Sequence, residues 1–159
     1  MNTLVWKCLG YRFDEEKEEW TDTECFPNWK TKHPTPPDFI GVQRIYSRDV
    51  DEISLRSNQD LVRSIPQSQK QWLIPTLKTL GFSGYTLKGL TPNKTRRAQC
   101  TNWLIYYREE LMGYTVDELK ERRRKRQEAE AAEDERKRQE AEKKGEEFDD
   151  FKIPVREVV

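Results

Sequence analysis

The side chains with the clearest chemical potential lie at the start of a predicted helix, where Lys94, Arg96 and Arg97 follow Thr91 and a proline. Threonine is a favoured N-cap residue and proline suits the first helical position, so a helix is expected to begin here. The unpaired N–H groups of a first helical turn carry partial positive charge. Together with Asn93 and the three cations, they would suit a phosphate or carboxylate group.

Three interpretations of this basic helix start stay open. The cations could form structural pairs with the acidic N-terminal half of the chain, or bind an acidic protein surface or peptide. They could also bind RNA or DNA, since a helix that follows another helix and a turn is similar to a helix-turn-helix arrangement. Of the two binding functions we favour the protein partner, because the chain as a whole has a net charge of zero, which weakens its attraction for a polyanion.

The remaining residues that could catalyse a reaction or hold a metal are scattered along the chain. Cys8, Cys25 and Cys100 lack the close ligand pairs typical of zinc sites, and the only histidine, His33, lies beside a proline in a predicted loop. The sequence also contains neither of the common glycine-rich phosphate-binding motifs. We therefore predict no catalytic residue, no cofactor and no metal, and a protein that is not an enzyme.

The composition indicates that only part of the chain builds a core. Of its 159 residues, 34% are hydrophobic and 36% charged, with a mean hydropathy of −1.04. All five tryptophans and all six tyrosines occur at or before Tyr114. We predict an α+β, helix-rich compact domain at residues 1–113, a charged solvent-exposed helix at 114–145 and a flexible docking tail at 146–159.

Periodicity positions the basic helix start within this domain. Residues 4–13 form a short buried helix or strand, 14–24 an acidic surface loop, and 39–46 the best candidate strand. One helix is expected from residue 51 to the residue before Pro66, and a second from Pro66 to Gly81 with a kink at Pro75. The helix after Thr91 carries an apolar stripe that includes Cys100 and Trp103.

The segment beyond residue 114 has local signals for a helix but almost nothing to bury. Thr115 and Glu118 form a capping box, and pairs such as Glu121 with Lys125 have the favourable i,i+4 order. No apolar seam is present to close a coiled coil. The final stretch regains apolar side chains and is interpreted as a docking peptide with these anchors: Phe148, Phe151 and Ile153.

Charge is distributed unevenly along the chain. Residues 1–53 contain seven Lys/Arg and eleven Asp/Glu, a net charge of −4, whereas residues 54–108 contain nine Lys/Arg and one aspartate, a net charge of +8. A basic surface can attract acidic partners even when the total charge cancels. An odd number of cysteines, no signal-peptide pattern and no apolar stretch of about 20 residues predict a soluble protein of a reducing, cytosol-like compartment.

Several short segments also carry a family resemblance. The chain resembles an uncharacterised domain family of cyanobacteria and plastid-bearing eukaryotes in five segments: residues 4–14, 36–41, 57–59, 63–66 and 90–99. The resemblance implies the cytosol of a cyanobacterium or the plastid stroma, and a start at Met1 that is late relative to other members. It implies no activity, cofactor or catalytic residue. We therefore expect a non-enzymatic binding or assembly factor for protein partners, with RNA or DNA binding as the alternative.

Overall fold

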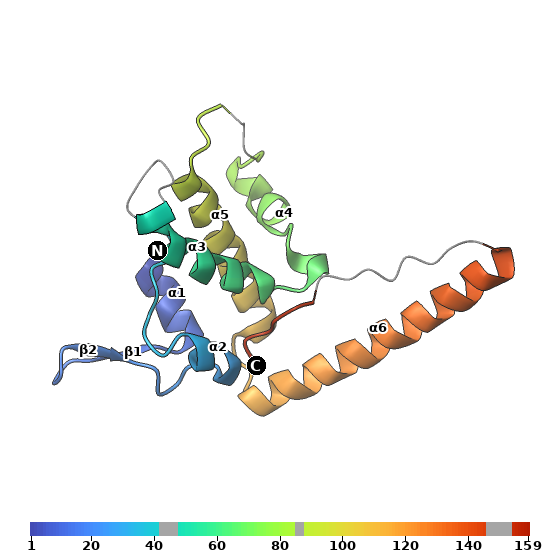
Figure 1. The fold of residues 1–159 in the computed structure, drawn as a ribbon, viewed down its shortest axis with the longest axis horizontal. Helices are drawn as coiled ribbons and strands as arrows, with labels where there is room; N and C mark the ends of the chain where they lie inside the picture. Colours follow the sequence, from blue (N-terminus) through green and yellow to red (C-terminus); the bar gives the residue numbers. More distant parts are fainter. Residues whose placement is uncertain (42–47, 85–87, 146–153) are drawn as a thin grey trace. The chain divides into compact units, whose positions relative to one another are not determined.

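The computed structural model describes residues 1–41, 48–84, 88–145 and 154–159, which form two compact units (Figure 1). Unit 1 comprises Met1–Met112 and Val155–Val159, and unit 2 is Gly113–Pro154. Helices predominate and one small two-stranded sheet is present among these residues, so the predicted α+β class is confirmed. The predicted long charged helix is confirmed as well.

Unit 1 begins with a helix and a hairpin. Helix α1 (Asn2–Leu9) ends at Gly10, whose φ of 102° is left-handed. A Cβ at this position would lie 2.1 Å from the carbonyl oxygen of Glu24, so only glycine fits. Strands β1 (Arg12–Asp14) and β2 (Glu19–Thr21) then pair antiparallel.

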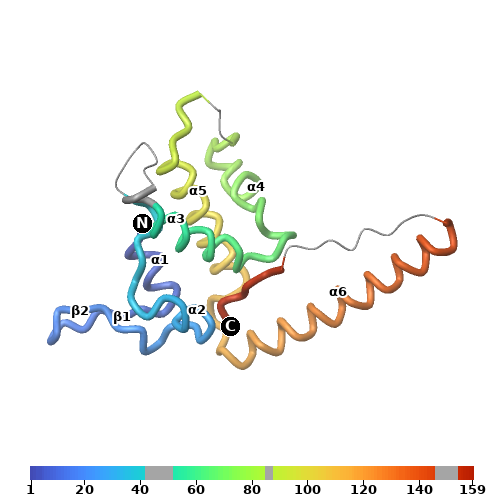
Figure 2. The backbone as a smooth tube through the Cα atoms, in the orientation of Figure 1, coloured from blue at the N-terminus to red at the C-terminus, as the bar shows by residue number. Residues whose placement is uncertain are grey.

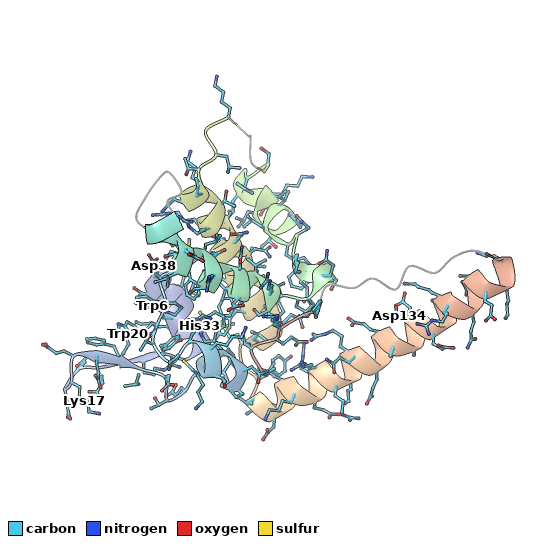
Figure 3. The ribbon with its side chains drawn as sticks, viewed as in Figure 1. Trp6, Lys17, Trp20, His33, Asp38 and Asp134 are labelled. Carbon is cyan, nitrogen blue, oxygen red and sulfur yellow. The ribbon has the colours of Figure 1, made fainter. Side chains whose placement is uncertain are left out.

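The hairpin corrects the interpretation of residues 14–24 as an acidic loop. The Asp14 carboxylate accepts the N–H groups of Glu16 and Lys17 and so forms the turn. Trp20 packs edge-on against Trp6 with ring centroids 5.3 Å apart, and the two residues lie close together in Figure 3. A single aromatic residue therefore anchors a strand that its acidic neighbours conceal in the sequence.

The strand predicted at residues 39–46 is absent from its described part. Residues 39–41 follow helix α2 (Pro27–Lys32) and form a turn, because the Asp38 carboxylate accepts the N–H groups of Ile40 and Gly41. These backbone groups are thereby removed from any sheet ladder. The rest of the predicted strand lies outside the described residues.

The second predicted helix is divided into three short helical pieces after α3 (Arg48–Arg63). They are η1 (Gln67–Gln69), α4 (Leu73–Leu77) and η2 (Lys78–Leu80). Leu73 N–H donates to Asn102 Oδ1 at 2.9 Å, so a side chain from another helix supplies the acceptor where α4 begins. Pro75, which has no N–H, lies within α4 and limits its length.

Helix α5 (Pro92–Tyr106) is the central helix of unit 1 and contacts α1, α3 and α4; Figure 2 shows its path between α3 and α4. Its Cys100 and Trp103 are fully buried, and Trp103 Nε1 donates to Ser64 Oγ at 3.0 Å. A π-helical turn, η3 (Tyr107–Leu111), follows. The core therefore forms around the stripe that the sequence predicts for this helix.

Unit 2 contains helix α6 (Val116–Lys144). The predicted capping box of Thr115 and Glu118 is confirmed, and Gly145 ends the helix in the left-handed conformation. The predicted anchors Phe148, Phe151 and Ile153 lie outside the described residues. In the part of the chain that the structure describes, no helix is long and apolar enough to cross a membrane.

Candidate functional site

Helix α5 begins against the turn at residues 38–41, and two of the four predicted site residues make this contact. Arg96 Nε donates to the carbonyl oxygen of Ile40 at 2.6 Å, and Asn93 Nδ2 donates to that of Gly41 at 3.0 Å. Arg96 is only 2% exposed. Its guanidinium therefore holds two distant chain segments together and is not presented to solvent.

The Asp38 carboxylate fixes the turn whose carbonyl oxygens accept those bonds, because it accepts the N–H groups of Ile40 and Gly41. The carboxylate also accepts hydrogen bonds from the Asn2 amide at 2.7 Å and from Ser54 Oγ at 3.3 Å. Burial raises the pKa of Asp38, but the bonds from Asn2, the turn N–H groups and Ser54 together outweigh it and hold the pKa below its usual value. The carboxylate is thus a structural acceptor. Figure 3 shows its position near the N-terminal start of α1.

Asn58 of α3 connects the turn to α5. Its amide nitrogen lies 3.3 Å from the carbonyl oxygen of Phe39, 3.4 Å from that of Arg96 and 3.5 Å from Cys100 Sγ. Burial raises the pKa of Cys100 to about 12, so this thiol is not a ready nucleophile. We refer to Asp38, Asn58, Asn93 and Arg96 as the turn clamp.

The other two predicted site residues, Lys94 and Arg97, are exposed. Lys94 Nζ donates to the carbonyl oxygen of Gly89 at 2.8 Å, and Arg97 Nε donates to Asn93 Oδ1 at 2.9 Å. The four residues predicted as one site therefore lie in two different environments. Asn93 and Arg96 face the turn, whereas Lys94 and Arg97 lie on the solvent side of α5.

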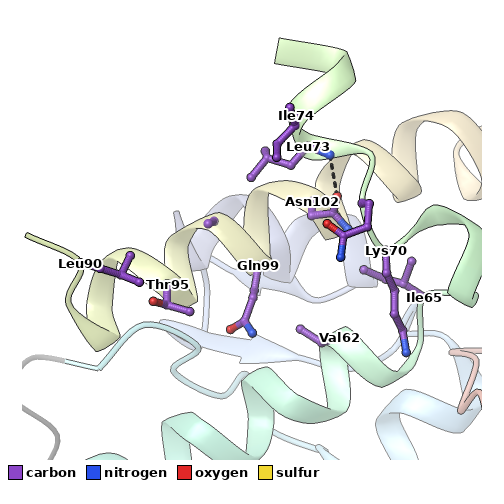
Figure 4. A pocket seen from close by; sticks show the side chains of 11 residues that line it. Val62, Ile65, Lys70, Leu73, Ile74, Leu90, Thr95, Gln99 and Asn102 are labelled. Carbon is purple, nitrogen blue, oxygen red and sulfur yellow. Dashed lines mark hydrogen bonds between the residues drawn. The ribbon is translucent and has the colours of Figure 1, made fainter. Parts of the chain in front are cut away.

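An apolar groove runs along another face of α5, between α3 and α4 (Figure 4). It consists of two adjoining hollows of about 340 and 410 Å³ that share Leu90, Thr95 and Gln99. The larger part of the wall is aliphatic and includes Val62 and Ile74. The full lining is Leu55, Val62, Ile65, Lys70, Gln71, Leu73, Ile74, Leu90, Thr91, Pro92, Thr95, Arg96, Ala98, Gln99 and Asn102.

The groove contains few polar groups that could orient a small substrate. Asn102 already accepts the N–H of Leu73, and its Nδ2 donates to the carbonyl oxygen of Gln69 at 3.4 Å. The other polar side chains of the hollow of about 340 Å³ are Lys70, Gln71, Thr95 and Gln99. Apolar contact, with a cation at one edge, is therefore the chemistry that this groove offers a ligand.

A histidine–carboxylate pair lies elsewhere in unit 1. His33 Nε2 is 3.3 Å from Asp60 Oδ2, and the His33 ring stacks on Trp29 with centroids 4.4 Å apart. Burial lowers the pKa of His33, opposed by the hydrogen bond and charge of Asp60. Tyr11 donates its hydroxyl to the His33 carbonyl oxygen and accepts the Trp29 Nε1–H at 3.1 Å. The imidazole is thus packed into an aromatic cluster.

A model of the domain of unknown function DUF1823 matches residues 1–109 of the chain. The chain belongs to this family. A protein solved as a solution NMR structure is 43% identical to it, with 67% of this chain and 77% of that chain covered and a TM-score of 0.49. No curated protein matches the chain.

The DUF1823 match contains both the turn clamp and the groove, whereas α6 and the C-terminal residues lie beyond it. The segments that carry the resemblance meet at the turn clamp, because Asp38, Asn58 and Arg96 each come from a different one. Within the described ranges, no group of three or more His, Cys, Asp or Glu residues could hold a metal ion.

Sequence reasoning did not find the groove. Its lining comes from α3, α4, α5 and the segments that connect them, and each part contributes only a few residues that look like ordinary core or loop positions. Two apolar residues of the lining are partly exposed in the structure, Ile74 at 43% and Leu90 at 39%, and nothing in the local sequence pattern distinguishes them from core residues.

Proposed function

We propose that this chain is a non-enzymatic binding or assembly factor that acts on protein partners in the cytosol or plastid stroma of a phototroph. The observation that carries the proposal is the apolar groove between α3, α4 and α5. An exposed aliphatic groove bordered by polar residues is typical of sites that receive an apolar segment of another protein.

Charge suggests which protein segment would bind there. The groove lies in the part of the chain, residues 54–108, that has a net charge of +8. Lys70 lines it, and Lys94 and Arg97 occupy the neighbouring face of the same helix α5. A partner segment with aliphatic side chains between acidic ones would match both features.

The alternative is RNA or DNA binding through residues 94–97. Burial of Arg96 leaves Lys94 and Arg97 as the cations of the helix start that a phosphate backbone could reach. Among the described residues that line the groove, none is aromatic, so it offers no platform for stacked bases. These two facts favour a protein partner over a nucleic acid.

The decisive experiment is capture from a phototroph lysate, with and without nuclease, using the full chain and two charge-matched double variants. The groove variant is Ile74→Glu with Leu90→Glu. The control is Ile53→Glu with Leu80→Glu, two positions that are 74% and 80% exposed and do not line the groove. We expect one nuclease-resistant partner to be retained by the control and lost by the groove variant.

The nucleic-acid alternative has its own measurement. If the chain binds RNA or DNA, the slope of log affinity against log salt should be about −0.7 to −0.9 per phosphate contacted. Lys94→Ala with Arg97→Ala should then flatten that slope. Micromolar, salt-sensitive RNA binding by the unaltered chain, or retention of the protein partner by the groove variant, would contradict our proposal.

A further inference from the structure

The last five residues of the chain belong to unit 1, although the whole of unit 2 separates them from it in sequence. Val158 is 2% and Val159 3% exposed. Terminal residues are usually exposed and poorly ordered unless something holds them. The C-terminus therefore occupies a specific place on the domain, and Figure 1 shows it beside α2.

Asn28 of α2 holds this segment by its backbone. Its main-chain N–H donates to the carbonyl oxygen of Val158 at 3.1 Å, and its side-chain Nδ2 donates to that of Glu157 at 3.2 Å. One residue thus binds two successive peptide carbonyls. A third bond holds the segment to α3. The Arg156 N–H donates to the carbonyl oxygen of Arg63, the last residue of α3, at 2.9 Å.

These contacts are those of a peptide-recognition site. These three hydrogen bonds involve only backbone groups of the segment, so they would hold other peptides of the same backbone conformation. Selectivity then comes from the buried side chains of Glu157, Val158 and Val159.

We propose that the surface of unit 1 at Asn28 and Arg63 is a binding site for a peptide segment of another protein, one that carries two adjacent aliphatic residues. In this chain Val155–Val159 occupies the site and competes with that partner. The DUF1823 match contains Asn28 and Arg63 but not the peptide, so the domain supplies the site and the extension supplies the occupant.

The site is distinct from the groove proposed above. Neither Asn28 nor Arg63 lines that groove. A peptide on the same chain has a higher effective concentration at the site than a free peptide, so it competes with free peptides. A partner must therefore present its segment at comparable local concentration, or bind when residues 155–159 have left the site.

The first test uses the full chain with Val158→Asp and Val159→Asp, which should eject the tail, and a fluorescein-labelled synthetic peptide of residues 154–159. We expect saturable binding to this variant at least about tenfold tighter than to the unaltered chain, in which the tail competes. Adding Asn28→Asp should abolish binding. Lys30→Ala, on the same helix α2, is the matched control and should not change it.

A second peptide tests whether the site recognises the two adjacent valine side chains. The same sequence with aspartate in place of its last two valines should not bind. If the folded double aspartate variant fails to bind the parent peptide, or binds the substituted one equally well, the proposal is wrong.

Hydrogen exchange of the unaltered chain provides an independent test that does not require a variant to fold. If the segment is a displaceable ligand, the Asn28 amide should exchange through a local opening that low denaturant hardly affects. Exchange of Asn28 only together with the core amide of Trp103, in the global unfolding event, would show that the segment is a fixed part of the core. That result would overturn the proposal even if the variant did not fold.

Discussion

Unit 1 and helix α6 of unit 2 are each stabilised by their own interactions, which differ greatly in the sequence separation of the paired residues. In unit 1, Arg96 bonds across 56 residues to Ile40, and Asn93 across 52 residues to Gly41. In α6, Arg124 pairs with Glu121 three residues away and with Glu128 four residues away.

This difference in sequence separation determines how each unit should respond to the loss of one interaction. A long-range bond in a buried site closes a large loop, and its loss leaves a polar group without a partner in the core. A surface pair within a helix contributes only a fraction of 1 kcal/mol and is replaced by water when lost. We therefore expect cooperative loss of structure in unit 1 and local fraying in α6.

The largest effect should come from Trp103→Ala. This residue is fully buried and bonded to Ser64, so the change should lower the free energy of unfolding of unit 1 by about 3–5 kcal/mol. Urea denaturation followed by circular dichroism measures it. Phe13→Ala, at a residue 48% exposed, is the control and should cost far less. Equal midpoints for the two variants would contradict the assignment of Trp103 to the core.

Two adjacent arginines provide the next comparison. Arg96→Ala removes a buried charged donor and leaves the Ile40 carbonyl with only the 3.4 Å bond from Asn93 Nδ2, so we expect a loss of about 2–3 kcal/mol in the free energy of unfolding. Arg97→Ala, one residue along the same helix but exposed, should stay within about 0.5 kcal/mol of the unaltered chain. If Arg97→Ala were the more destabilising of the two, the turn clamp would not be the stabilising feature of α5.

The stability of unit 1 should depend on pH through the partly buried His33. Its pKa is lowered in the folded chain, so below about pH 6.5 the unfolded chain binds a proton that the folded chain does not. The free energy of unfolding should therefore fall as the pH drops through 6.5 and level off below the folded pKa. Urea midpoints between pH 8 and 5 measure this slope, which His33→Gln should remove. If the variant showed the same slope, the pH dependence would have to come from another titratable group.

The smallest effect should be confined to the first turn of α6. Thr115→Ala breaks the capping box and should weaken the start of the helix by about 1 kcal/mol. Faster amide exchange at residues 116–119, with an unchanged urea midpoint for unit 1, is the expected result. A shift of the unit 1 midpoint would show that the two units unfold together.

Acid should act on the same turn. The Thr115 N–H and hydroxyl lower the pKa of Glu118, so both halves of the capping box are present above the unfolded pKa of about 4.3, and the Glu118 half is lost as the pH falls through the lower folded value. The bond from the Glu118 N–H to Thr115 Oγ1 remains, so the difference in amide exchange at residues 116–119 between the unaltered chain and Thr115→Ala should shrink in acid without vanishing. A difference as large at pH 2 as at pH 7 would contradict the role given to the Glu118 carboxylate.

Much of the secondary structure follows from local signals in the sequence. Thr91 and Thr115 both begin helices where they were expected to, because each side chain accepts an N–H three residues ahead. Elements that depend on distant partners were predicted poorly. The hairpin at Trp20 requires Trp6, and the start of α4 at Leu73 requires the side chain of Asn102.

The candidate site shows the same division. The sequence placed four polar residues at one helix start but could not tell which of them face inward. Successive residues of a helix point about 100° apart, so Arg96 and Arg97 have the same local signal and opposite surroundings. The groove depends on three helices, and no one of them reveals it in its sequence.

The sequence by itself determined the capped charged helix α6, the start of α5 and the uneven charge, since each depends on residues within a few positions of one another. Only the tertiary structure decided that Arg96 closes the turn at Ile40, that α3, α4 and α5 leave a groove, and that Val158 is bound by Asn28. The physical reason is that a buried donor or a valine side chain could be satisfied at many places in a domain. The packing of the whole fold selects one of them.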